Sequence, residues 1–146
     1  MIIGIDLGTT FSAVAVIDDT GRPKIVHNSD GENVTPSCIE LRDDGVMEVS
    51  EQARKSIFLN ANAAGRFKRE MGTSTTYTLG GKTFTPTQLS AIVLKKLVQD
   101  AESSLGEKIR EAVITIPANF AHEAREATMA AAKQAGLNVE FIISEP

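Results

Sequence analysis

A carboxylate, a glycine and two hydroxyl side chains occur together in the short stretch Asp6-Leu7-Gly8-Thr9-Thr10. Glycine permits a tight bend and lets a ligand approach the backbone, and the N–H groups of such a turn can bind an anion. Threonine hydroxyls can donate to phosphate oxygens, and a carboxylate beside phosphates commonly holds Mg²⁺, often through water. The stretch therefore favours a phosphate-and-magnesium loop, although a capped turn closed by an Asx-type hydrogen bond fits the same residues.

The spacing of these residues differs from that of two common phosphate-binding motifs. A P-loop requires the pattern G-x-x-x-x-G-K-[ST], and a dinucleotide-binding turn requires G-x-G-x-x-G. The stretch IGIDLGTTF matches neither pattern.

A second candidate is the basic segment GRFKREMG, which contains Lys68 and Arg69. A lysine near a transferring phosphoryl group can stabilise negative charge or orient the attacking water. The same cluster, with Arg66 and Glu70 beside it, also fits a solvated basic helix face. The spacing alone leaves both interpretations open.

The remaining candidates are single titratable residues. Glu145 lies at the end of a predicted strand, where ligands gather in α/β sheets, although a terminal surface residue fits that position equally. His27 and His122 have no second ligand at the spacing of a metal site, so we expect neither to be catalytic. Cys38 is the one cysteine and cannot form an internal disulfide, which fits a reducing compartment. It has no CxxC partner, so it is predicted to be a small core residue.

Short strands and hairpins are predicted for the first part of the chain. The pattern of apolar residues and turn signals predicts strands at residues 2–6, 12–17, 24–27, 38–41 and 46–49. The first three are close enough to form an antiparallel meander, and the loop that begins at Asp6 joins the first two. Residues 50–60 predict a helix with Ser50 as its N-cap, and residues 61–71 predict a further helix. The strands at 38–41 and 46–49 are expected to form one hairpin, and a second hairpin is expected to turn at Gly80-Gly81.

The second part of the chain predicts an alternation of helices and strands. Thr85-Pro86-Thr87-Gln88 combines a capping box with proline at the first helical position, and apolar residues then recur at helical spacing as far as Leu105. A strand at 112–116, a helix at 121–135 and a strand at 139–143 follow. Such a unit implies parallel strands joined by a right-handed crossover. The sequence thus predicts an α/β core, residues 1–39 and 111–146, with an inserted α+β segment at 40–110.

Composition excludes several classes of protein. The chain has 146 residues, of which 42% are hydrophobic and 23% charged, so we expect it to fold rather than stay disordered. A net charge of −4 without a long basic run argues against nucleic-acid binding. No apolar stretch approaches the roughly 20 residues of a membrane span, and the N-terminus lacks the pattern of a signal peptide. Because the strand-like NVEFIISEP closes the chain, we expect the chain to be a fragment of something longer.

Several segments together resemble the start of a DnaK-type heat-shock chaperone. They are IGIDLGTT, TPS, FKREMG, GEKIREAVITIPANF and AGLNVEFIISEP, and they follow one another in the family's order over the whole chain. The opening segment is shared with the wider superfamily of actin, sugar kinases and chaperone ATPases, whereas AVITIPA and AGLNV are more specific to the chaperones. The resemblance implies an ATPase domain of two lobes, each with a ribonuclease-H-like (actin-like) core, of which this chain would be most of the first lobe.

The resemblance also implies roles for residues that match the family's motifs. Asp6 would help to hold the water shell of Mg²⁺, and Gly8, Thr9 and Thr10 would contact the phosphates of ATP or ADP. Lys68 would stabilise the transition state of ATP hydrolysis.

Three more residues match functional positions of the family. Glu145 would contact the magnesium water shell or the attacking water, and Pro117 and Arg125 would couple the nucleotide state to a substrate-binding domain. The sequence departs from the family's usual residues at Phe11, Asn119, Ala121, His122 and Ser144. These departures bear more on coupling between domains and on the co-chaperone response than on nucleotide binding.

The resemblance implies a cytoplasmic chaperone that hydrolyses ATP in order to bind unfolded polypeptide, with a J-domain co-chaperone and a nucleotide exchange factor as partners. Since the second phosphate loop and the adenosine pocket are missing, we expect this chain alone to have no meaningful ATPase activity. Apolar surface that a second lobe would normally cover would favour self-association of the fragment. The alternatives are a nucleotide-binding structural or actin-like protein, and a sugar or acetate kinase of the same superfamily.

Overall fold

The computed structural model of the chain describes residues 2–144, which form a mixed α/β fold built on a six-stranded sheet. The strand order is β11-β10-β1-β2-β3, and β4 (Thr35–Pro36) pairs with β2 outside this path. The strands β1 (Ile2–Asp6), β2 (Phe11–Ile17) and β3 (Pro23–Val26) form the predicted antiparallel meander. On the other side of β1, β10 (Glu111–Ile116) and β11 (Asn138–Ser144) run parallel to it.

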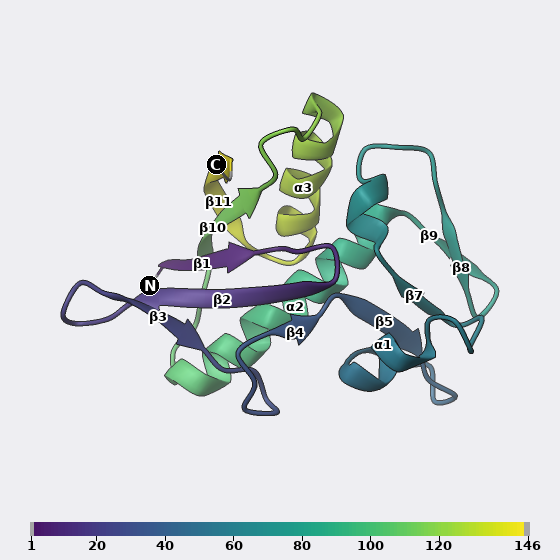
Figure 1. The fold of residues 1–146 in the computed structure, drawn as a ribbon, viewed down its shortest axis with the longest axis horizontal. Helices are drawn as coiled ribbons and strands as arrows, with labels where there is room; N and C mark the ends of the chain where they lie inside the picture. The colour runs from purple at the N-terminus through teal and green to yellow at the C-terminus, as the bar shows by residue number, and fades with distance from the viewer. Residues whose placement is uncertain (1, 145–146) are drawn as a thin grey trace.

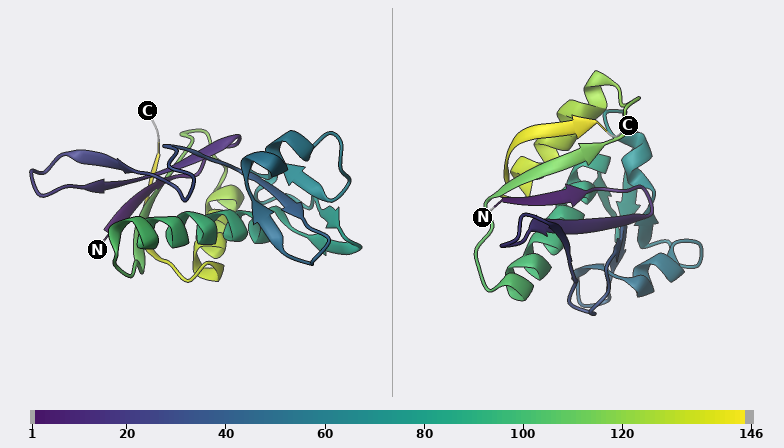
Figure 2. Two further views of the ribbon diagram at one scale, coloured as in Figure 1. Left: turned by 90° about the horizontal axis from the view of Figure 1, so that it is seen from below. Right: turned by 60° about the vertical axis from the view of Figure 1, so that its left-hand side comes forward.

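Two helices cover one face of this sheet, as Figures 1 and 2 show. They are α2 (Pro86–Leu105) and α3 (His122–Gln134). The predicted capping box of Thr85 and Gln88 is present, and Gly106 ends α2 in the left-handed conformation with a φ of 69°. Because side chains alternate along a strand, each strand directs every second apolar residue at these helices. Ile5, Val14 and Ile114 are buried in this way.

The segment between β4 and α2 forms a smaller unit beside the sheet (Figure 1). Its three-stranded antiparallel sheet has the order β6-β5-β7, with bounds Met47–Val49, Cys38–Leu41 and Ala63–Gly65. The helix α1 (Glu51–Ser56) begins at the predicted cap Ser50, whose hydroxyl accepts from the backbone of Ala53. The short 3₁₀ helix η1 (Phe67–Glu70) and the predicted hairpin β8 (Tyr77–Leu79) and β9 (Lys82–Phe84) complete the unit.

The helix expected at residues 61–71 is wrong, because this segment contains β7 and η1 instead. Hydrogen bonds of two asparagines fix the backbone that leads into β7. Asn60 Oδ1 accepts from the backbone of Asn62 at 2.9 Å, and the carbonyl of Asn62 accepts from the backbone of Leu41 at 2.8 Å. These bonds direct residues 63–65 along β5, and tertiary pairing overrides the helix propensity of the alanines. The helix expected at 50–60 is shorter than predicted and ends at Ser56.

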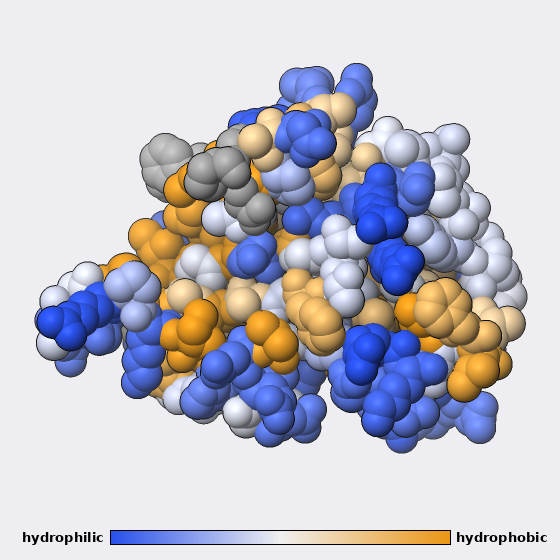
Figure 3. All heavy atoms as spheres, viewed as in Figure 1, coloured by the Kyte–Doolittle hydropathy of each residue, from blue (hydrophilic) through white to orange (hydrophobic). Residues whose placement is uncertain are grey.

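The opposite face of the sheet carries no helix among the described residues (Figure 2). Apolar side chains gather over the strands on this face, as the orange spheres of Figure 3 show. Ile2, Ile17 and Ile25, from the three strands of the meander, are 56%, 67% and 44% exposed. No helix within residues 2–144 has the length and apolar character that crossing a membrane requires.

Candidate functional site

The loop between β1 and β2 is built around Gly8. A Cβ atom at this position would lie 1.9 Å from the carbonyl oxygen of Phe11, so only glycine fits. The Gly8 N–H donates to Ser12 Oγ at 3.2 Å, which folds the loop back onto the first turn of β2. Thr9 is half-buried and Thr10 is exposed, so both lie at the outer surface of this tight bend. The sequence prediction of a glycine-dependent loop at the end of β1 is therefore confirmed.

Two serines that were given no role in the sequence analysis hold this loop. Ser37 Oγ donates to the carbonyl of Gly8 at 2.9 Å, and the hydroxyls of Ser12 and Ser37 lie 2.8 Å apart in a buried hydrogen bond. The Ser37 N–H also donates to the carbonyl of Thr10 at 2.9 Å. The sequence contained an indication of the role of Ser12. Ser12, Val14 and Val16 are alternate residues of β2, so the three side chains point to the same buried face. A hydroxyl at a buried strand position needs a partner, and here the partner is the loop.

Lys68 joins the loop from a distant part of the chain. Its side chain is buried, with 5% of the residue exposed, and its Nζ donates a hydrogen bond to the carbonyl of Leu7. The same Nζ lies 5.6 Å from the centre of the Phe120 ring, which places the cation over an aromatic face. Arg69, by contrast, is exposed. The interpretation of this segment as a solvated basic face therefore holds for Arg69, whereas Lys68 is buried.

The backbone around η1 brings Lys68 into this position. Arg66, which precedes η1, is in the left-handed region with a φ of 58°. Gly72, which follows η1, has a φ of 80°, and a Cβ there would lie 2.6 Å from the carbonyl carbon of Glu123 at the start of α3. The close approach of Gly72 to α3 therefore fixes the end of the segment that carries Lys68.

Asp6 lies at the carboxyl end of β1, where the strand leaves the sheet. Its side chain is exposed, and Thr115 Oγ1 of the neighbouring parallel strand donates to Asp6 Oδ1 at 3.3 Å. An exposed carboxylate at the carboxyl ends of parallel strands has room for a hydrated cation beside it. Within residues 2–144 no group of three or more acidic, histidine or cysteine side chains could hold a metal alone. A magnesium ion at Asp6 would hence need water and phosphate oxygens as its other ligands.

The residues assigned to coupling lie on the next connection of the sheet. Pro117 is the first residue after β10, and its carbonyl accepts from the Phe120 N–H at 3.1 Å. This turn places the Phe120 ring beside the Lys68 amine. Arg125 is exposed on the first turn of α3. Glu145 lies outside the described residues. The structure thus brings Asp6, the loop and Lys68 together, and it places Pro117 within one short turn of that group.

Three of the positions that depart from the family pattern lie along the connection into α3. Asn119 is exposed, and Ala121 stands at the N-cap of α3 without a side-chain hydrogen bond. His122 is also exposed, with Nε2 3.7 Å from Glu126 Oε1. An alanine at the N-cap supplies no acceptor for the first N–H groups of the helix, so this end of α3 is weakly capped.

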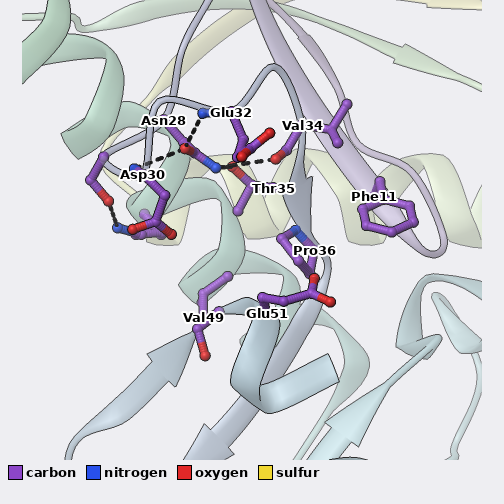
Figure 4. Close-up of a pocket in the computed structure, with 12 residues that line it drawn as sticks. Phe11, Asn28, Asp30, Glu32, Val34, Thr35, Pro36, Val49 and Glu51 are labelled. Atoms are coloured by element: carbon purple, nitrogen blue, oxygen red, sulfur yellow. Dashed lines mark hydrogen bonds between the residues drawn. The ribbon is translucent and has the colours of Figure 1, made fainter. Parts of the chain in front are cut away.

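A hollow of about 380 Å³ lies beside the loop, between α1 and the connection from β3 to β4 (Figure 4). Phe11 stands at one end of it, and the Arg54 guanidinium lies 5.7 Å from the centre of the Phe11 ring. Arg54 Nε also donates to both carboxylate oxygens of Glu51, at 2.9 and 3.0 Å, which lowers the pKa of Glu51. None of Asp6, the loop residues 7–10 and Lys68 lines this hollow, so it is separate from the candidate phosphate site.

Comparison with known proteins gives a consistent result over the whole chain. The model of the Hsp70 protein family matches residues 2–146. A relative described as "Chaperone protein DnaK", from Mycoplasma mobile, is 44% identical over 145 residues. This alignment covers 99% of the chain but 24% of the relative, so the chain spans about a quarter of that protein's length. The chain therefore belongs to the Hsp70 protein family.

Proposed function

We propose that this chain forms most of the first lobe of the nucleotide-binding domain of an ATP-dependent molecular chaperone, similar to DnaK. Family membership over residues 2–146 supports this proposal. The observation that carries it is the meeting of the loop at Gly8 with the buried amine of Lys68. A cation beside a glycine loop and an exposed carboxylate is the combination of groups that phosphoryl transfer needs.

The loop would hold phosphates and Asp6 would hold a magnesium ion through water. Gly8 permits the tight bend, and Thr9 and Thr10 on that bend would supply the hydroxyls that contact the phosphates. Asp6 stands at the start of the same bend, with one carboxylate oxygen accepting from Thr115. When bound, Mg·ATP would supply the scissile phosphate bond.

Lys68 would contribute positive charge that is fixed before the nucleotide binds. Its amine is held between the Leu7 carbonyl and the Phe120 ring, so little side-chain freedom remains to be lost. A preorganised cation stabilises developing negative charge better than a mobile one, since no reorganisation accompanies the reaction. Glu145 is proposed to act on the magnesium water shell or the attacking water, by family resemblance.

The proposed architecture follows the same family. Residues 1–39 and 111–146 would form an incomplete ribonuclease-H-like core of an actin-like ATPase, and residues 40–110 an inserted subdomain. The parent protein would act in the cytoplasm, with unfolded polypeptide as substrate and with a J-domain protein and a nucleotide exchange factor as partners. Pro117 and Arg125 would transmit the nucleotide state. Because a second lobe would form the opposite wall of the cleft, we expect the 146-residue chain alone to hydrolyse no ATP above background.

Titration calorimetry with Mg·ADP tests the proposal on the complete protein. We expect Asp6→Asn to weaken binding by about tenfold or more, because it removes a charged ligand of the magnesium water shell. Asp19→Asn is the matched control, since it removes the same charge from an exposed turn at the other end of β2. Equal affinities of wild type and Asp6→Asn would contradict the assignment of Asp6. No detectable binding by the wild-type complete protein would contradict the proposed function itself.

A further inference from the structure

One carboxylate oxygen in the interior of the molecule has no hydrogen-bond partner among the described residues. Asp100 lies on α2, and its side chain is only 9% exposed. Its Oδ1 accepts from Lys96 Nζ at 2.9 Å, and Lys96 Nζ also donates to Ser29 Oγ at 2.9 Å. Asp100 Oδ2 is buried and unsatisfied. Burying a carboxylate oxygen without a donor is costly, so this oxygen requires an explanation.

A small cavity adjoins this carboxylate. It has a volume of about 10 Å³ and lies between α2, β2 and the segment that connects β3 to β4. Asp100 is the one carboxylate among its lining residues, and Lys96 does not line it. Of the two carboxylate oxygens, Oδ1 accepts from Lys96, whereas Oδ2 has no donor among the described residues. The cavity is about large enough for one water molecule.

The opposite wall of the cavity offers further polar groups. Asn28, Asn33 and Thr35 all line it. Asn28 Nδ2 donates to Thr35 Oγ1 at 3.2 Å and to the Val34 carbonyl at 3.1 Å, a geometry that Figure 4 shows from the side of the neighbouring hollow. The Thr35 hydroxyl therefore acts as an acceptor toward Asn28, which leaves its own proton to be donated elsewhere.

We propose that a single water molecule binds in this cavity and joins α2 to the segment before β4. The water donates to Asp100 Oδ2 and accepts from the hydroxyl of Thr35, so that an unsatisfied acceptor and a remaining donor are paired at once. A metal cation fits less well. The Lys96 ammonium already lies 2.9 Å from the same carboxylate, and only one carboxylate lines the cavity.

The position of this water gives it a structural role near the loop. Thr35 of β4 pairs with Ser12 of β2, and Ser37 is the first residue after β4. Ser12 and Ser37 are the residues whose hydroxyls hold Gly8. The water thus connects α2 to the strand segment on which the loop rests, independently of the direct contact made by Lys68.

High-resolution crystal structures of three forms of the chain test the inference. In the wild type we expect a water oxygen within about 3 Å of Asp100 Oδ2. Asp100→Leu fills the cavity with an apolar side chain and should lose this water. Lys96→Met removes the neighbouring charge without touching the cavity and should retain it.

Three results would overturn the inference. A dry cavity in the wild type, or the same water in Asp100→Leu, would exclude a water held by Asp100. The third result would come from wild-type crystals grown with thallium(I). An anomalous peak in the cavity would identify a monovalent cation instead of water. If Asp100→Leu fails to fold, the wild-type and Lys96→Met structures still decide the question.

Discussion

The side-chain amine of Lys68 donates a hydrogen bond to the backbone carbonyl of Leu7, although 61 positions separate the two residues in the sequence. Leu7 is the first residue after β1, and Lys68 belongs to η1 in the smaller unit of the fold. The bond is buried and involves a charged donor, so it is among the stronger kinds of hydrogen bond in proteins. It ties the candidate phosphate loop to a segment that has its own sheet.

Replacing Lys68 by methionine should destabilise the chain by about 1–3 kcal/mol, because the Leu7 carbonyl loses a charged donor inside the molecule. Methionine has a similar length and keeps most of the apolar packing. Arg69→Met is the control on the same 3₁₀ helix, and since Arg69 is exposed we expect a change within about 0.5 kcal/mol. Urea denaturation measures both. Equal denaturation midpoints for the two variants would show that the Leu7 contact contributes nothing.

A methyl group at Gly8 should disrupt the loop. The added Cβ would lie 1.9 Å from the Phe11 carbonyl oxygen, so β2 must shift or the loop must open. We expect Gly8→Ala to cost about 1–3 kcal/mol, the usual range for overpacking. Gly4→Ala on β1 is the matched control, because its Cβ would find its nearest neighbour, the Ala15 carbonyl oxygen, at 3.8 Å. Thermal denaturation compares them, and a Gly8→Ala variant as stable as Gly4→Ala would contradict the tight bend at Gly8.

The hydroxyls of Ser12 and Ser37 should behave as a coupled pair. Each single replacement by alanine breaks the bond between the two hydroxyls and one bond to Gly8, at a cost of about 1–3 kcal/mol, while the remaining serine keeps its own bond to Gly8. The double replacement removes both groups, and it should therefore cost less than the sum of the two single changes. A double-mutant cycle in urea measures this difference. Strict additivity would mean that the two hydroxyls do not interact.

Cys38 should make the stability fall at alkaline pH. Burial raises the pKa of its thiol above the ordinary value of 9.0, because the thiolate is poorly solvated where only 3% of the residue is exposed. The folded chain therefore binds this proton more tightly than the unfolded chain does. The resulting stability is complete below pH 9.0 and is lost as the pH rises through the folded-state pKa.

The measurement for Cys38 is the free energy of unfolding between neutral pH and pH values above 9.0, compared with Cys38→Ala. The alanine variant should lose less stability over this interval. Tyr77, whose pKa is also raised by burial, is present in both chains and provides a common background. Parallel curves for the two proteins would exclude a contribution from Cys38. The native thiol should also resist alkylation until the chain is unfolded.

Elements that carry their own local signals were predicted well from the sequence. The alternation in β1 and β2, the capping box at Thr85 and the left-handed glycine at position 106 are each determined by near neighbours. Residues 61–71 were predicted wrongly, because the alanine-rich stretch favours a helix locally while β5 offers it a partner in the tertiary structure. The two-residue strand β4 was missed, since Pro36 weakens any strand signal there.

The candidate site was predictable only in its parts. The loop was recognisable because Gly8 and its polar neighbours are adjacent in sequence. The burial of Lys68 could not be predicted from the sequence, because this burial depends on the left-handed turn at Arg66 and on the contact of Gly72 with α3. The bond from Ser37 to Gly8 similarly joins residues 29 positions apart, and no local pattern predicts it.

The pairing of β1 also has a consequence for synthesis on the ribosome. One edge of β1 pairs with β2, which follows within a few residues, whereas the other edge pairs with β10, beginning with Ile2 opposite Glu111. Until residues 111–116 leave the exit tunnel, the nascent meander has a strand edge with unpaired backbone groups. A chain that emerges from its N-terminus must keep that edge from pairing with other nascent chains until β10 is available to cover it.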